Sequence, residues 1–585
     1  MDFRLLYESF IRSLTLRRVF AILFAVGFVV YMNSFVNDLF WDDYDSIVNN
    51  QYVRNFDLPD FFTKNLTAGA GITDNYWRPL LLISFATDYA IGGVEPFFYH
   101  FQNFAWHLGA SLLVFLVGIR LFPKRKTASL IASLLFLVHP LQTEAVTYAA
   151  GRADPMHTAL MLGSIYFFLR HIGSGKYPAL LWSLLLFVLA LLTKERAIVL
   201  PIILVLCLFL VPIEGAVRGW KRKFPLLSPY VAIAGIYAVS RATFLHFADT
   251  FDPGTTTILQ NTTLWQKILV FLAGIGTYGK LIVWPDHLYM EKTLPLPSSF
   301  FDPMVLFGIS ILVLTAFLVL ASLKRKKLVA FCLLGFFATL LPSMYVYPVQ
   351  GLLYEHWLYP AFPWLFLGIG LGLSDYLDGT KRIGRIPSFV PATALALILI
   401  ALGVRTIARN LDWQTPVRFY EKNVAEGGVS GRVYTNLGMA YDDAHQPEKA
   451  VPAYRLAIDA SGDTLFQPWF DLGNTLSKLG KTDEAIDAYH HAILLNPNFT
   501  PTSTNLAKIF VDRRDNATAI AILDEALRTH PDDLSLLFAQ AAISVNAGDT
   551  ATAETYAQKI LAIDPNNQQA QQIFSFIRSR PASVK

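Results

Sequence analysis

Three acidic residues gather directly after the first long hydrophobic stretch. Asp42, Asp43 and Asp45 follow the apolar run 19–36, and the first of them comes six residues after its end. A carboxylate at a membrane surface can take the proton from an attacking hydroxyl; the alternative is a solvated acid pair that caps a helix. Asp42 and Asp43 are therefore candidate catalytic bases, and spacing alone does not decide between them. A divalent metal here is a second alternative, although three adjacent acids lack the spread ligand set of a firm metal site.

Further ionisable and polar residues interrupt other apolar stretches, where charge is costly and marks function or pairing. They are His100, Asn103 and His107; His139, Glu144, Arg152 and Asp154; Lys194, Glu195 and Arg196; and Glu355 with His356. His100, Asn103 and His107 share one helix face, so helix–helix hydrogen bonding is an alternative to a site. For Lys194 and Glu195 the alternative is an interfacial ion pair. Cations and acids converging on one leaflet would suit phosphate binding beside a carboxylate base.

The composition indicates a membrane protein. Of 585 residues 54% are hydrophobic and 16% charged, and the mean hydropathy is +0.41, whereas soluble domains average about 45–50% apolar and about 25% charged residues. The net charge is only +4, and the basic residues lie in short clusters between apolar runs. That pattern is typical of cytoplasmic loops and not of a nucleic-acid-binding stripe. Cys207 and Cys332 both lie inside apolar runs, so a disulfide framework or zinc site is excluded.

Apolar runs approach the roughly 20 residues that a membrane span needs. They are 19–36, 97–119, 128–148, 155–170, 179–193, 197–213, 225–240, 265–285, 303–322, 328–343, 358–375 and 389–406. Basic clusters between the runs predict cytoplasmic loops. These clusters are Arg17 and Arg18; Lys124 to Lys126; Arg218 with Lys221 to Lys223; Lys324 to Lys327; and Lys381, Arg382 and Arg385.

The run 265–285 does not fit this alternation, because basic clusters on both sides of it are expected in the cytoplasm. We expect it to be re-entrant or interfacial. About eleven crossings then remain in a polytopic, all-α membrane domain over 1–408, with external loops over 37–78 and 241–302. An odd number of crossings places the remaining C-terminal residues on the same side as 37–78.

The C-terminal part is a repeat array. Ala485, Ala519 and Ala553 are 34 residues apart, as are Pro497, Pro531 and Pro565. Small residues where paired helices pack, and proline where a repeat ends, are typical of a tetratricopeptide α-solenoid. We assign 431–580 to these repeats and 409–430 to a linker or incomplete repeat. Such solenoids usually bind a peptide or a protein partner, and a passive scaffold is the alternative.

Several motifs carry a family resemblance. The string from Asn33 to Asn50, Tyr76-Trp77-Arg78-Pro79-Leu80, Tyr99 to Asn103, the run from His139 to Asp154, and Tyr354 to Pro360 resemble the transmembrane and tetratricopeptide-repeat-containing O-mannosyltransferases, members of the glycosyltransferase C superfamily. The resemblance covers nearly the whole chain and suggests a bacterial member. It departs at His356, where arginine is expected, which removes a permanent positive charge.

The resemblance implies transfer of a sugar, mannose or another hexose, from a polyprenyl-phosphate donor, with inversion, to Ser/Thr hydroxyls of exported proteins. Asp42 or Asp43 would be the base, and the repeats would bind the polypeptide acceptor. Arg78, Arg152, Lys194 and His356 would hold the donor phosphate. The residues expected to position sugar or acceptor are Asp154, Glu144, His100, His139, Glu195 and Glu355. No cofactor or metal is assigned, and no nucleotide-binding fingerprint occurs, which favours a lipid-carried donor.

Three questions stay open at the level of sequence. The acceptor could instead be a lipid or a glycan, or the chain could be a non-catalytic, membrane-anchored scaffold for an envelope complex. Short loops favour a bacterial inner membrane with a periplasmic active site. The sequons at Asn65 and Asn261 keep an endoplasmic reticulum membrane with a luminal site as the alternative. The oligomeric state is not predicted.

Overall fold

The computed structural model describes residues 9, 11, 13–212, 220–247, 263–290, 292, 297–343, 353–378 and 389–579. Five residues invoked above, Arg218, Asn261, Lys381, Arg382 and Arg385, lie outside this part of the chain. The described residues form helices and no strand. The chain divides into two compact units, Met1–Phe419 and Tyr420–Lys585, and the division falls inside the predicted linker 409–430. We call them the membrane unit and the repeat unit.

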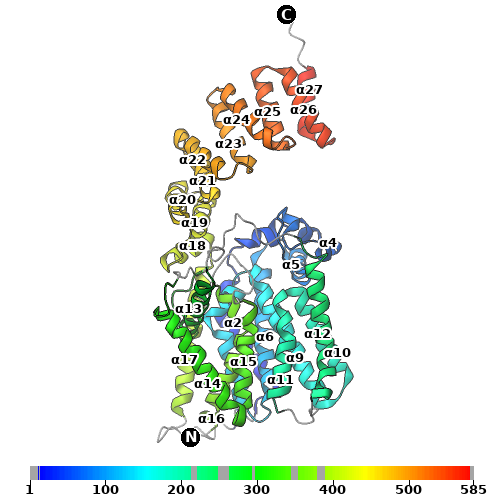
Figure 1. The fold of residues 1–585 in the computed structure, drawn as a ribbon, viewed down its shortest axis with the longest axis vertical. Helices are drawn as coiled ribbons and strands as arrows, with labels where there is room; N and C mark the ends of the chain where they lie inside the picture. The colour runs from blue at the N-terminus through cyan, green and yellow to red at the C-terminus, as the bar shows by residue number, and fades with distance from the viewer. Residues whose placement is uncertain are drawn as a thin grey trace, which may run out of the picture. The chain divides into compact units, whose positions relative to one another are not determined.

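The described part of the membrane unit is built of helices of 4 to 26 residues (Figure 1). They are α2 Leu16–Tyr31, α5 Pro79–Gly92, α6 Pro96–Leu121, α7 Lys126–Val138, α8 Thr143–Val146, α9 Ala153–Ser174, α10 Tyr177–Thr193, α11 Leu200–Leu210, α12 Trp220–Ala242, α13 Leu264–Val283, α14 Pro303–Arg325, α15 Lys327–Leu340, α16 Phe362–Leu377 and α17 Phe389–Asp412. The loop after α2 adds α3 Gln51–Asn55 and α4 Leu58–Thr63. In Figure 1, α4 and α5 lie at one end of the bundle that contains α6, α9, α10 and α12.

Local sequence explains several helix starts. The Thr15 side chain accepts the Arg18 N–H and caps α2. Asp302 caps α14 and is followed by Pro303. Proline lacks an N–H, and at the first position of a helix this N–H would have no partner within the helix. Thr263 and Gln266 form a reciprocal capping box at the start of α13. Each cap satisfies backbone donors that the helix itself leaves unpaired.

Five helices in the described part of the chain are long and apolar enough to cross a membrane: α2 extended to Ser34, α6, α13, α14 and α17. A bent pair, α7 with Pro140–Val146, adds a sixth if it is one span. Other apolar helices, among them α10, α15 and α16, have 10–17 residues and are shorter than a bilayer core of about 30 Å requires. The expected count of about eleven crossings is therefore not confirmed.

The structure adds detail to two of the expected segments. The run 128–148, expected as one span, bends by 58° at Pro140, because a proline disfavours helical backbone at the residue before it; His139 is accordingly extended (φ −72°, ψ 129°). Segment 265–285 forms one continuous helix of 20 residues, α13, which is long and apolar enough to cross a membrane; its re-entrant or interfacial placement stays a prediction. Its small residues serve close packing, because a Cβ on Gly276 would lie 2.3 Å from the Met304 carbonyl oxygen of α14.

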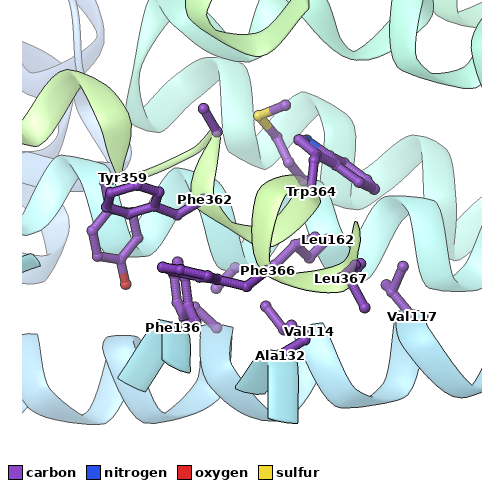
Figure 2. Close-up of a cluster of buried hydrophobic side chains, with 14 of the residues drawn as sticks. Val114, Val117, Ala132, Phe136, Leu162, Tyr359, Phe362, Trp364, Phe366 and Leu367 are labelled. Carbon is purple, nitrogen blue, oxygen red and sulfur yellow. The ribbon is translucent and has the colours of Figure 1, made fainter. Parts of the chain in front are cut away.

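Aromatic packing joins α16 to α7 in the core of the membrane unit. Phe362 and Phe366 of α16 extend toward the same region as Phe136 of α7 (Figure 2), and the Phe136 and Tyr359 rings are 5.1 Å apart. At Gly370 the backbones come so close that a Cβ would lie 2.3 Å from the Ala128 carbonyl oxygen. This contact places the segment before α16, which carries Glu355 and His356, against the segment that follows α7.

The repeat unit is a row of helix pairs (Figure 1). Its helices are α19 Gly431–Asp443, α20 Pro447–Ser461, α21 Phe466–Lys478, α22 Thr482–Leu495, α23 Thr500–Asp512, α24 Asn516–Thr529, α25 Leu534–Ala547, α26 Thr550–Ile563 and α27 Gln568–Ser579. The chain enters them through α18 Pro416–Ala425. Ala485, Ala519 and Ala553 are each fully buried, as their 34-residue spacing predicts.

Candidate active site

The two adjacent acids of the first loop have different environments. Asp43 is 1% exposed, and its carboxylate accepts the Ala150 N–H at 2.7 Å and the Phe40 N–H at 3.0 Å. Burial raises the Asp43 pKa to about 8, although both backbone N–H groups oppose this shift. Asp42, in contrast, is exposed. Asp43 therefore ties the loop to residue 150, while Asp42 is the acid that a substrate can reach.

Aromatic rings flank the exposed acid. Trp41 stacks on Tyr148 with ring centres 5.2 Å apart, and Tyr148 stacks on Trp413 at 5.4 Å. The Asp42 N–H donates to the Tyr148 hydroxyl oxygen at 3.1 Å. Trp41 has a φ of +60°, a backbone conformation that bulky residues rarely adopt.

A cluster of cations and acids lies around the segment between the end of α10 and the start of α11. Lys194 is extended (φ −156°, ψ 133°), which ends α10, and its Nζ lies 2.8 and 2.9 Å from the two Asp154 carboxylate oxygens. Arg78, the N-cap of α5, binds Glu195 through two hydrogen bonds of 2.9 and 3.2 Å. Parallel hydrogen bonds of this kind fix a guanidinium in place.

Burial and pairing set the charge of this cluster. Burial would raise the Glu195 pKa, but Arg78 and Lys194 outweigh it and lower that pKa to about 2. Burial lowers the Lys194 pKa to about 8, although Asp154 opposes the shift. Glu195 is therefore anionic at neutral pH, and the Lys194 ammonium loses its proton within a physiologically accessible range.

Arg196 adds a cation with spare donor capacity. Its guanidinium lies 5.1 Å from the centre of the Trp357 ring, and its Nη1 atom is buried without a hydrogen-bond partner among the described residues. A buried donor without a partner is rare in folded proteins and calls for an explanation. An anionic ligand between Lys194 and Arg196 would supply one.

A second charged group comes from the segment before α16. His356 donates its backbone N–H to Glu144 at 2.9 Å and holds the same carboxylate through Nδ1 at 2.9 Å. Lys292 Nζ lies 3.2 Å from Glu355, which is 1% exposed. Arg409 Nη2 lies 3.9 Å from Glu355 and its Nη1 3.3 Å from Asp412.

The segment Ala150 to Asp154 connects the acid turn to the cation cluster. The Ala150 N–H binds Asp43, and Asp154 binds Lys194. Ala150 and Asp154 are four residues apart, and four residues of helix span about 6–8 Å along the helix axis. The expected convergence of first-loop acids and distant cations is therefore supported through one short segment.

Arg152, between these two anchor points, is fully buried and held by protein groups. It pairs with Asp88 at 2.5 Å and donates to Asn103 at 2.6 Å, to the Tyr99 carbonyl at 2.9 Å and to Ser84 at 3.1 Å. Its guanidinium also lies 4.7 Å from the Phe85 ring centre. These contacts fix the fold of the segment and leave its donors committed.

The histidines singled out in the sequence bind backbone carbonyls. His100 Nε2 lies 3.0 Å from the Asn37 oxygen, His139 Nε2 lies 3.1 Å from the Ile282 oxygen, and His107 Nε2 lies 3.1 Å from the Leu137 oxygen. The His107 contact joins α6 to α7, as the alternative of helix–helix hydrogen bonding expects, whereas His100 binds a carbonyl of the loop after α2. Asn65, the sequon residue inside the described part of the chain, is 6% exposed and accepts the Thr67 N–H.

Five residues of the site were not selected as site residues from the sequence. Arg196 stands directly after two selected residues, so its neighbourhood was a usable signal. Arg409 and Asp412 are charged residues at the end of the last apolar helix, a weaker signal. Lys292 has no local signature, and Tyr148 lies inside the run from His139 to Asp154 but was given no role there. Within the described residues, no group of three or more His, Cys, Asp or Glu side chains is placed to hold a metal ion.

Comparison with known proteins matches both parts of the chain. Residues 81–241 match the family described as dolichyl-phosphate-mannose-protein mannosyltransferase. Residues 431–464, 467–499 and 504–568 match tetratricopeptide repeat families.

Curated relatives extend the match beyond these domains. Protein O-mannosyl-transferase Tmtc1 of Drosophila melanogaster is 30% identical over 46% of this chain and 33% of its own length. Protein O-mannosyl-transferase TMTC3 of Mus musculus is 22% identical over 87% of this chain and 58% of its own length. The chain therefore spans between about one third and three fifths of the length of these relatives.

Proposed function

We propose, from the match of this chain to the transmembrane and tetratricopeptide-repeat O-mannosyltransferases in both its domains and its relatives, that it is a membrane glycosyltransferase. It moves a hexose, mannose by the names of its relatives, from a polyprenyl-phosphate donor to Ser/Thr hydroxyls of polypeptides. The observation that carries this proposal is the exposed Asp42 next to Asp43, which is joined through Ala150 to Asp154 to a cation cluster; a buried Arg196 donor in that cluster has no partner among the described residues.

The reaction is a single displacement with inversion. The acceptor hydroxyl oxygen forms a bond to the anomeric carbon while the bond from that carbon to the phosphate oxygen breaks. The hydroxyl proton passes to the Asp42 carboxylate, and the polyprenyl phosphate leaves with the bonding electrons. A phosphate leaving group needs no proton, so one carboxylate suffices, unlike glycoside hydrolysis with its pair.

Cations stabilise the charge that develops on the leaving phosphate. We assign this role to Arg78, Lys194 and Arg196, because they lie in one cluster and Arg196 has a donor without a partner among the described residues. Arg152 is the weaker choice, since its donors are bound to Asp88, Asn103, Ser84 and Tyr99. His356 is held by Glu144 and would supply positive charge only when protonated.

Positioning of sugar and acceptor then falls to Asp154, Glu195, Glu144 and Glu355, which border the two charged groups. His100 and His139 are better described as structural, because their rings bind backbone carbonyls. The chemistry requires no metal.

The repeat unit binds the polypeptide acceptor. Polar side chains link neighbouring repeats: Asn474 accepts hydrogen bonds from Tyr489 at 2.7 Å and Asn505 at 2.8 Å. Amide side chains at such positions can bind peptide backbone, and a solenoid offers an extended surface for it. If the repeats serve only assembly, deletion of 430–585 would leave acceptor modification unchanged.

The proposal includes about eleven crossings and counts the short apolar helices α10, α15 and α16 among them. It places the active site and the repeats in the periplasm of a bacterial inner membrane. The lumen of the endoplasmic reticulum would support the same chemistry.

The test is transfer by the full-length protein in liposomes, with a short-chain polyprenyl-phosphate mannose donor and Ser/Thr-rich polypeptides. Mass spectrometry would read added hexose. Asp42→Asn should lower the rate at least about 100-fold, while the melting temperature stays near that of the wild type. Transfer at the wild-type rate by Asp42→Asn would remove the assigned base. Transfer to lipid acceptors alone would favour the lipid alternative, and no transfer to any acceptor would favour the scaffold.

A further inference from the structure

We infer that Tyr148 and Trp41 are positioning residues for Asp42. Their stacked rings hold the main chain of the proposed base in a fixed position. This inference rests on the proposed function and extends it to residues that do not themselves touch the reacting atoms.

The first observation is the backbone of the acid turn. Trp41 occupies the left-handed region with a φ of +60°. For a large aromatic residue this conformation is a genuine outlier and persists only where surrounding contacts over-determine it. Outliers of this kind cluster at functional sites, and Trp41 directly precedes the exposed Asp42.

Contacts on both sides of Asp42 hold this backbone. Before it, the Trp41 ring lies on the Tyr148 ring with an interplanar angle of 20°. After it, Asp43 accepts the Ala150 and Phe40 N–H groups and closes the turn. At Asp42 itself, the backbone N–H donates to the Tyr148 hydroxyl oxygen at 3.1 Å. Tyr148 thus contacts Trp41 through its ring and Asp42 through its hydroxyl.

Further contacts hold Tyr148 in place. Its ring stacks on Trp413, which is 1% exposed. Its carbonyl oxygen accepts a hydrogen bond from Asn103 at 2.8 Å, and Asn103 in turn accepts the Arg152 Nε–H at 2.6 Å. The buried Arg152, Asn103 and Tyr148 therefore form a rigid support, and this support gives Arg152 a role other than binding phosphate.

The consequence is a defined position for a base on an exposed loop. A general base must lie within hydrogen-bond reach of the proton that it removes, and loss of its alignment lowers kcat more than donor binding. The contacts of Tyr148 and Trp41 leave the Asp42 carboxylate exposed while its main chain is held.

Two variants test whether Tyr148 and Trp41 position Asp42. Tyr148→Phe keeps the ring stack and removes only the hydroxyl that accepts the Asp42 N–H; we expect kcat to fall about five- to tenfold, with the donor KM within about twofold of wild type. Trp41→Gly removes the stack but keeps the left-handed backbone accessible, so kcat should fall further. The matched control is Tyr31→Phe, because the Tyr31 hydroxyl is buried without a hydrogen-bond partner among the described residues and its loss should leave kcat unchanged.

A double-mutant cycle separates positioning from general destabilisation. In an Asp42→Asn background, Tyr148→Phe should change the residual rate by less than about twofold, because the residue acts only through Asp42. A wild-type kcat in Tyr148→Phe would overturn the inference. An equal fold-loss in the presence and absence of the Asp42 carboxylate would also overturn it. Full activity of Asp42→Asn alone would instead contradict the proposed function, so the two failures are distinguishable.

Discussion

The buried ion pairs around the candidate site of the membrane unit contrast with the exposed ion pairs of the repeat unit. In the membrane unit, the partners of Lys194–Asp154 and Arg152–Asp88 have side chains exposed by 6% or less. In the repeat unit, Arg455 and Glu484 are 58% and 46% exposed, and Arg528 and Glu525 are 74% and 72% exposed.

The difference indicates where charge serves chemistry. Removing two ions from water is costly, and a buried pair is often no more stable than an apolar pair of the same volume. Buried ions in the membrane unit are therefore poor candidates for stability alone and good candidates for a site that binds a charged ligand. The repeat unit is stabilised instead by close contacts of small residues, such as Gly438 against the ring of Tyr454.

The largest expected effect comes from breaking a buried pair. Lys194→Met leaves Asp154 buried without its cation and should lower the free energy of unfolding by about 3–5 kcal/mol, in addition to abolishing transfer. The measurement is thermal unfolding of the detergent-solubilised chain. In the matched control, Lys194→Met combined with Asp154→Asn, most of that stability should return. A double variant as unstable as the single one would contradict the assignment.

A smaller effect is expected where the repeat unit packs most closely. A Cβ on Gly438 would lie 2.4 Å from the Tyr454 ring, so Gly438→Ala should destabilise the repeats by about 1–3 kcal/mol with unchanged transfer to small acceptors. The control is Gly109→Ala in α6, where a Cβ meets nothing within 4 Å. Protease susceptibility of the repeats, read by mass, checks both variants. A more resistant Gly438→Ala protein would show that the close contact is not limiting.

The pH dependence of donor binding sharpens the comparison further. With a Lys194 pKa of about 8, the ammonium is charged below that pH and neutral above it. The kcat/KM for donor should therefore fall above about pH 8, by up to about tenfold per pH unit for one required proton. Lys194→Arg keeps its charge, so the fall should move to higher pH. Identical profiles for the two proteins would assign the pH dependence to another group.

The smallest effect is expected at the exposed pairs of the repeat unit. Arg455→Met removes the partner of Glu484 and should change stability by less than about 1 kcal/mol, since exposed ion pairs contribute little. Thermal unfolding at low and high salt measures this change. A loss as large as that from Lys194→Met would contradict the contrast between the two units.

Much of the fold could be predicted because it depends on local patterns. The 34-residue spacing of Ala485, Ala519 and Ala553 identified buried positions without any knowledge of their contacts. Apolar runs likewise identified the long helices, but they predicted the lengths of these helices less accurately. The bend at Pro140 has a local cause, the proline itself, whereas the close approach of α13 to α14 at Gly276 depends on the neighbouring helix.

The site was predicted in part. The sequence selected Asp42 and Asp43 together, and only burial separates the exposed acid from the one that binds Ala150. It also selected Arg152 for phosphate, whereas the structure binds that guanidinium to Asp88, 64 residues earlier in the chain. Tyr148 lies inside the quoted run from His139 to Asp154, but the run assigns it no role, because that role arises from a stack with residues far away in sequence.

The sequence by itself determined the helical class, the membrane character and the repeats, because hydrophobic burial and helix periodicity act over neighbouring residues. Only the tertiary structure decided which carboxylate faces solvent and which cation each buried acid binds. The physical reason is that Coulomb and hydrogen-bond energies depend on distances in space, and Lys194 and Asp154 are 2.8 Å apart in space but forty residues apart in the chain.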